Sequence, residues 1–180
     1  MRLPTIKRED LSPENQQRWD RITAGRSGGG GGGPYSALIH APLLADLLAA
    51  AENYYRKDAA LAETDRELVI LATAREFETH YPWTRHEIRG RQVGLREEAI
   101  ETIRAHGSLE KLMPRERLLV EIVRSLLRQH RLSNEIFTLA LAEMGPQKFV
   151  ELVALIGHYS TIGSVANAFD VRPPDGSKTF

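Results

Sequence analysis

The chain has 180 residues, a formal net charge of zero, and 42% hydrophobic and 27% charged residues. This length fits one domain with a substantial core, and the balanced charge gives no reason to expect a nucleic acid or an anionic membrane as a partner. The N-terminal stretch has no apolar segment typical of a signal peptide, and the absence of cysteine excludes disulfides and thiolate chemistry, so we expect a cytoplasmic protein.

The chain begins with a segment that we expect to be an extended arm. Ser12 and Pro13 are typical of a helix start, because serine caps a helix and proline is favoured at its first position, and this helix should run to about Thr23. The run Gly28–Gly33 lacks the Lys-Ser or Lys-Thr that follows a phosphate-binding loop, so it indicates a flexible surface loop. Residues 1–33 thus form an N-terminal segment of arm, short helix and glycine-rich loop.

Two helices are predicted after this loop. Leucine and alanine recur at helical spacing over residues 42–60, and a second helix should end at about Glu78. The second helix opens on Thr-Asp-Arg-Glu at 64–67, which matches a capping box in which Glu67 bonds back to the helix start. This structural role for Glu67 and a functional role both remain open from the sequence.

The stretch from Glu67 to His86 holds the densest polar chemistry in the chain. Pro82 is expected to begin a third helix over 82–93, so polar side chains stand on two helices that flank one break at Tyr81. In a simple antiparallel hairpin, the 1.5 Å rise per residue leaves Glu67 and His86 on the order of 10 Å apart along the axes. Contact between them would need a steep crossing angle or a partner helix.

The rest of the chain is also predicted to be helical, over residues 96–105, 114–129, 133–143 and 146–169. The last of these segments is long and apolar, but four of its residues make it too polar for a comfortable membrane span. These residues are Glu151, His158, Tyr159 and Asn167. Its small residues suit close packing against another helix or subunit. Because no stretch shows the alternation of a strand, the predicted fold is all-α.

A faint internal repeat has a period near 50 residues. Residues 64–76 resemble residues 114–126, and the spacing of Gly94 and Gly107 is echoed later in the chain. The polar chemistry is not repeated, because His86 maps onto or beside Ile136. We therefore expect an internal duplication of a helical unit in which only one half is functional.

One set of residues carries a resemblance to a known family. It comprises HAPLLADLL at 40–48, Glu67, HYPW at 80–83, His86 and LVALIGHYSTIGSVANAFDV at 152–171. This set resembles the carboxymuconolactone decarboxylase family, whose fold is shared with the AhpD-like alkylhydroperoxidases. The resemblance implies an AhpD-like helical bundle over residues 34–171, followed by a tail at 172–180.

The chain departs from this family at two positions. The Cys-x-x-Cys pair of the peroxidase branch would fall at Thr79 and Pro82, so thiol peroxidase activity is excluded on chemical grounds. The cysteine-free branch often has Tyr-Glu-Trp-x-x-His, and here Pro82 replaces the glutamate. The identity of the substrate is therefore left open.

By resemblance, the chain would act as a cofactor-free carboxy-lyase in aromatic compound degradation. An unsaturated lactone would lose carbon dioxide, and the resulting enolate would be reprotonated with groups nearby to stabilise its charge. Histidine suits proton transfer near neutral pH. The candidate catalytic residues are His86, Glu67 to orient it, and Tyr81 or His80 as further donors. The candidate substrate-binding residues are Arg85, Arg89 and Trp83, with Arg75 equally placed.

Structural roles compete with each of these assignments. His86 could be an interface histidine, Tyr81 and Trp83 could be packing aromatics, and His80 could cap the preceding helix. No spacing typical of metal ligands occurs, so no metal site is expected. The alternative function is a non-catalytic protein that binds a small molecule. In either case we expect a homo-oligomer, a trimer or a hexamer, because such helical units commonly bury long apolar helices between subunits.

Overall fold

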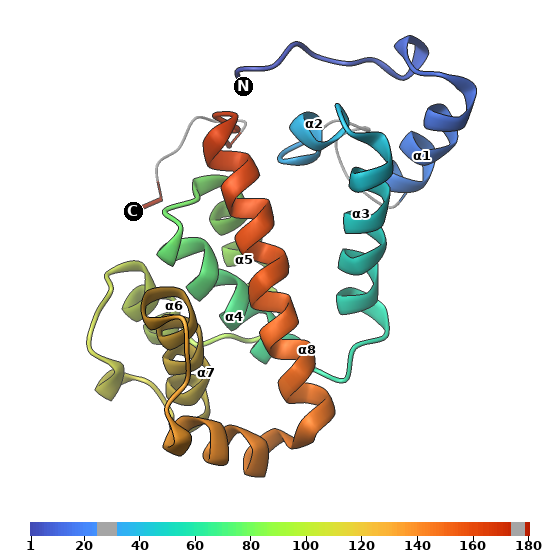
Figure 1. Ribbon diagram of the computed structural model, residues 1–180. Helices are drawn as coiled ribbons and strands as arrows, with labels where there is room; N and C mark the ends of the chain where they lie inside the picture. Colours follow the sequence, from blue (N-terminus) through green and yellow to red (C-terminus); the bar gives the residue numbers. More distant parts are fainter. Residues whose placement is uncertain (25–31, 174–178) are drawn as a thin grey trace.

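The computed structural model describes residues 1–24, 32–173 and 179–180, and within them it is all-α with no strand (Figure 1). The α-helices are α1 (Pro13–Thr23), α2 (Tyr35–Leu38), α3 (Pro42–Lys57), α4 (Glu63–Glu76), α5 (His80–Gln92), α6 (Glu97–Arg104), α7 (Pro114–Arg124) and α8 (Asn134–Ala168). Short turns of 3₁₀-helix lie at Arg8–Asp10 and Leu109–Lys111, and α7 continues into a π-helical turn at Ser125–Gln129. The predicted all-α class is confirmed. Residues 28–31 of the glycine run, predicted as a flexible loop, lie outside the described residues.

Helix α4 is the centre of the bundle. Every residue from Arg66 to Ala74 is buried, and α5, α6, α7 and α8 all pack against α4. A helix that is surrounded by other helices needs apolar side chains on all sides, which explains the apolar run at residues 68–71. In Figure 1, α8 lies across α4 and α5. Side chains that leave α4 therefore meet other helices instead of solvent.

A smaller core joins the N-terminal helices to the end of α8. Ile22 of α1, Ile39 after α2, and Ala45 of α3 pack with Ile162 of α8. The guanidinium of Arg21 also forms an ion pair with Asp46, with Nη2 and Oδ2 2.5 Å apart. The predicted N-terminal segment thus contributes a helix that packs on α3.

Helix α8 contains a break. Gly145 has φ 71° and ψ 170°, and Pro146 follows it, so the segment consists of two helices joined end to end. These two helices match those predicted over 133–143 and 146–169. Among the described residues, α8 alone is long and apolar enough to cross a membrane by length and composition, and 56% of the apolar window is buried within the protein. A buried core helix can have the same length and apolar composition.

The two segments that resemble each other in sequence become α4 and α7, which pack against one another. Asp65 at the start of α4 and Arg115 at the start of α7 form an ion pair, with Oδ2 and Nη2 2.8 Å apart. The duplication itself stays a prediction.

Candidate active site

Glu67, His86 and Tyr159 form a continuous chain of hydrogen bonds inside the bundle. Oε2 of Glu67 lies 2.6 Å from Nδ1 of His86, and the hydroxyl of Tyr159 lies 3.1 Å from Nε2 of the same ring. The residues come from α4, α5 and α8, and their exposed fractions are 3%, 6% and 6%. Buried polar groups are costly unless they are hydrogen-bonded, so these mutual contacts make the burial possible.

The arrangement of hydrogen bonds fixes the role of each nitrogen of His86. A carboxylate only accepts hydrogen bonds, so the contact with Glu67 assigns a proton to Nδ1. In the neutral ring Nε2 is then an acceptor, and the hydroxyl of Tyr159 donates to it. The two rings also meet edge to face, with centroids 5.1 Å apart and an interplanar angle of 89°. The phenol and the imidazole are thus held by both packing and a hydrogen bond.

Glu67 is placed to stay ionised. Burial raises the pKa of the Glu67 carboxyl, but His86 and the charge of Arg66 together outweigh burial and hold this pKa below its ordinary value. Nε of Arg66 lies 3.3 Å from Oε1 of Glu67, and Nη1 of Arg66 donates to the carbonyl of Tyr55 at 3.1 Å. A buried carboxylate with two cationic or donor neighbours is a suitable partner for a histidine that gains a proton.

Tyr159 is held in its protonated form. Burial raises the pKa of the Tyr159 hydroxyl well above its ordinary value, and the negative charges of Glu52 and Glu67 raise it further. Glu52 is itself buried on α3, where it accepts a hydrogen bond from the hydroxyl of Tyr35 at 3.0 Å and pairs with Arg56. The phenol is therefore a proton donor or a relay, because the isolated tyrosinate would be strongly disfavoured there.

The capping-box interpretation of Glu67 is wrong. Helix α4 begins at Glu63 with Ala62 at the cap position, two residues earlier than that interpretation requires. Glu67 lies in the second turn, where the backbone is already hydrogen-bonded, and its carboxylate reaches His86 and Arg66 instead.

Tyr81 packs against the end of the glycine run. Gly33 has φ +64°, and a Cβ built on it would lie 2.3 Å from Cε1 of Tyr81. Only glycine allows this approach and this backbone conformation together. The contact gives Tyr81 a packing role at the junction between the run and α2.

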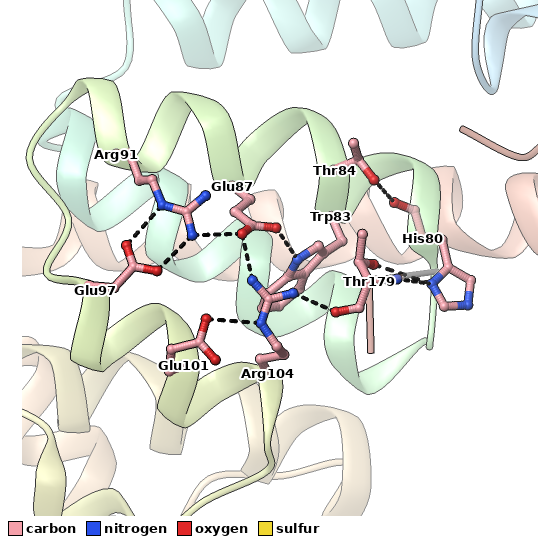
Figure 2. A network of polar contacts seen from close by, with 9 residues as sticks. All are labelled: His80, Trp83, Thr84, Glu87, Arg91, Glu97, Glu101, Arg104 and Thr179. Atoms are coloured by element: carbon pink, nitrogen blue, oxygen red, sulfur yellow. Dashed lines mark hydrogen bonds and ion pairs between the residues drawn. The ribbon is translucent and has the colours of Figure 1, made fainter. Parts of the chain in front are cut away.

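His80 and Trp83 belong to a second polar cluster, shown in Figure 2. His80 is the first residue of α5, which starts two residues before Pro82. Its role as a cap of the preceding helix stays a prediction. Nδ1 of His80 lies 3.2 Å from Oγ1 of Thr179, and Nε1 of Trp83 donates to Glu87 at 2.7 Å. The structure thus separates these two candidate residues from the pair Glu67 and His86.

The three candidate arginines lie in different surroundings. Arg85 is exposed on α5, whereas Arg89 is partly buried and close enough to Tyr159 for its positive charge to oppose the rise in the phenol pKa. Nε of Arg75 donates to the carbonyl of Arg104 at 2.7 Å. Of these three arginines, Arg89 is therefore the one whose charge acts on the hydroxyl of Tyr159.

Sequence reasoning did not assign a role to Tyr159 or to Glu52. Tyr159 is 73 positions from His86, and only the packing of α8 on α5 brings them together. A signal was present, because Tyr159 is one of few polar residues on a long apolar helix. Within residues 1–24, 32–173 and 179–180, no three His, Asp or Glu side chains are arranged to hold a metal ion.

Comparison with known proteins supports the fold. No protein-family model and no curated protein sequence matches the chain. A similar solved structure is an alkylhydroperoxidase AhpD core, described as an uncharacterized peroxidase-related protein, from Ralstonia eutropha JMP134. It superposes with a TM-score of 0.76 at 20% sequence identity, over 97% of this chain and 92% of that chain. The chain therefore has an AhpD-like all-α fold.

Proposed function

We propose that this protein is a cofactor-free enzyme that transfers protons on a small carboxylated or enolisable molecule, as a carboxy-lyase of the carboxymuconolactone decarboxylase type does. The observation that carries the proposal is the buried chain from Glu67 through His86 to the hydroxyl of Tyr159. Such a chain can move a proton without forming an isolated charge, because each group in it gives up one proton as it accepts another from its neighbour.

Reprotonation of an enolate uses the chain with His86 protonated on both nitrogens. The O–H bond of Tyr159 breaks as its proton forms a C–H bond with the enolate carbon. Nε2 of His86 delivers its proton to the phenol oxygen in the same step, which leaves neutral imidazole. Glu67 stabilises the charged imidazolium before the transfer, and Arg89 is the candidate to hold the carboxylate of the substrate.

The AhpD-like fold is shared with a protein described as peroxidase-related. A thiol peroxidase needs a cysteine thiolate, and this chain has no cysteine. Proton transfer by histidine, glutamate and tyrosine is the chemistry that remains on the buried chain of hydrogen bonds.

The alternative is a non-catalytic protein of the same fold that binds a small molecule. It is favoured by the burial of the three residues, which satisfy one another and are at most 6% exposed. Under this alternative, the hydrogen-bonded chain would organise the interior instead of reacting.

The test is the release of carbon dioxide and the loss of ultraviolet absorbance on incubation with 4-carboxymuconolactone. We expect turnover by the wild type and a loss of about 10² to 10⁴ in rate for His86→Ala and Glu67→Gln. His40→Ala is the matched control, because this histidine is exposed and its Nε2 lies 3.0 Å from the carbonyl oxygen of Pro4, away from Glu67 and His86. A folded wild type that is stabilised against heat by the lactone, but releases no carbon dioxide, would establish the binding protein instead.

A further inference from the structure

The ring of Phe180 lies in a cradle formed by Arg75, His80, Trp83 and Arg104, from α4, α5 and α6. It stacks on His80, with centroids 4.5 Å apart and an interplanar angle of 23°. It meets Trp83 edge to face, with centroids 5.4 Å apart at 87°. The guanidinium carbon of Arg75 lies 4.4 Å from the centre of the same ring. One aromatic ring thus receives three different contacts that only a π-system provides.

The residue before it is held by polar contacts. The amide of Thr179 donates to Nδ1 of His80 at 3.3 Å, and Nη1 of Arg104 donates to the carbonyl of Thr179. Figure 2 shows Thr179 between these two side chains, with Arg104 reaching up from α6. The cradle therefore recognises a ring together with the carbonyl oxygen next to it.

Three of the four walls, Arg75, Trp83 and Arg104, are also held by contacts that do not involve residues 179–180. Glu87 accepts hydrogen bonds from Nε1 of Trp83 and from Nη2 of Arg104, and Nε of Arg104 lies 3.0 Å from Glu101. Arg75 is fixed through its bond to the carbonyl of Arg104. Walls that are already organised lose little freedom when a ligand enters, which is the property of a preformed binding site.

The chemistry of the walls selects the class of ligand. Ordinary apolar packing depends on the size and the buried area of a side chain, and not on whether it carries a π-system. Here the ring faces an imidazole, an indole and a guanidinium, which favour a planar aromatic ring over an aliphatic group of similar size.

We propose that the cradle of Arg75, His80, Trp83 and Arg104 is a binding site for an aromatic ring that carries a nearby carbonyl oxygen, and that Phe180 occupies it as an internal competitor. The site is distinct from the pair Glu67 and His86. His86 contacts α4 and α8, whereas Trp83 contacts Arg104 of α6, and both His80 and Trp83 contact Phe180. The proposal does not depend on the proposed reaction.

The test compares the full chain with Phe180→Ala, both in a Trp19→Phe background so that fluorescence reports Trp83 alone. The probe is N-acetylphenylalaninamide, whose acetyl carbonyl stands in for that of Thr179. We expect Phe180→Ala to bind the probe about tenfold or more tightly than the parent, because the internal competitor is gone. Trp83 fluorescence and the ring resonances of His80 should change together.

N-acetylleucinamide is the matched control ligand, and we expect it to bind Phe180→Ala several times more weakly. Arg104→Gln in the Phe180→Ala background should weaken binding of the aromatic probe, because the donor to the carbonyl is removed. Equal binding by the parent and Phe180→Ala, or equal binding of the leucine and phenylalanine compounds, would overturn the proposal. Phe180→Leu, which keeps apolar volume and loses the ring, provides the same comparison if the alanine variant does not fold.

Discussion

At the level of single residues, His86 has a different partner on each ring nitrogen. Glu67 accepts from Nδ1, and the hydroxyl of Tyr159 donates to Nε2. The partner on Nδ1 sets the tautomer, and the partner on Nε2 is the group through which a proton can leave or arrive. The proposed reaction requires both partners, a carboxylate that orients the ring and a phenol that exchanges a proton with it.

Tyr159→Phe should separate the chemical role of the hydroxyl from its packing role. The ring contact with His86 is kept, but Nε2 of the buried ring loses its donor, so the variant should lose about 1–3 kcal/mol of unfolding free energy. The rate should fall by about 10² to 10⁴, because the last proton carrier is removed. Tyr54→Phe is the control, since that hydroxyl bonds Glu151 away from the site. The measurements are thermal denaturation and the lactone assay, and an unchanged rate would remove Tyr159 from the mechanism.

The Glu67 carboxyl makes a predictable contribution to acid sensitivity. Contacts with His86 and Arg66 hold the pKa of Glu67 below its ordinary value of 4.5. As the pH falls, the unfolded chain therefore binds a proton at Glu67 at a higher pH than the folded chain does. The resulting stability is present above pH 4.5 and is lost as the pH falls through the lower folded value. Denaturation midpoints measured between neutral pH and acid should therefore fall less steeply below pH 4.5 for Glu67→Gln than for the wild type. Parallel curves would contradict this.

The sequence pointed to Glu67 and His86 as a pair, but not to the geometry that joins them. A simple hairpin would leave them on the order of 10 Å apart along the axes. The observed contact of 2.6 Å forms because α4 and α5 pack directly against each other. Tyr159 could not be placed from periodicity, since helix spacing says which residues share a face of one helix and not which helices meet.

At the level of elements, most helices follow from apolar spacing and from serine, proline and glycine at their ends. Ser12 and Ser133 cap α1 and α8 as predicted, each accepting from a backbone amide in the first turn. The short α2 and the π-helical turn at Ser125–Gln129 could not be predicted. A single turn is too brief for periodicity to show, and a π-helical turn depends on how the end of α7 packs.

Gly145→Ala should destabilise the protein, although alanine favours helix over glycine. Gly145 has φ 71° and ψ 170°, a region that is essentially restricted to glycine, so the cost should be about 1–3 kcal/mol. Gly157→Ala is the matched control, because Gly157 is helical and an added Cβ meets no atom within 4 Å. It should be neutral or stabilising by up to about 1 kcal/mol. Urea denaturation of both variants checks the prediction, and equal effects would argue against strain at Gly145.

At the level of the whole molecule, we propose that α3 and the second half of α8 form a contact between subunits of a trimer or hexamer. The two helices pack together, and the hydroxyl of Tyr54 on α3 donates to Glu151 on α8 at 2.7 Å. Large apolar side chains are exposed on both helices, namely Leu43, Leu44, Leu47, Val150 and Val153. Exposed apolar side chains on neighbouring helices commonly mark an interface.

The double variant Leu47→Glu and Val150→Glu should be a monomer in light scattering, because two charges would be buried without partners in each contact. Ile88→Glu on α5 is the control, since Ile88 is also exposed but lies on another helix. It should keep the mass of the wild type. A wild type that is monomeric at micromolar concentrations would overturn this proposal.

The burial of α4 on all sides determines how the molecule comes apart on heating. Amide protons exchange with deuterated solvent through local openings at exposed elements and only through global unfolding at the most enclosed one, so the amides of Arg66 to Ala74 should exchange last. Glu67 belongs to this slowest-exchanging group, while His86 and Tyr159 are packed against its helix. We expect the site to unfold together with the bundle, because α5 and α8, which carry His86 and Tyr159, both pack on α4. Loss of activity and loss of helical circular dichroism should therefore coincide on one thermal transition, and the reaction should remain available up to the temperature at which the chain itself unfolds.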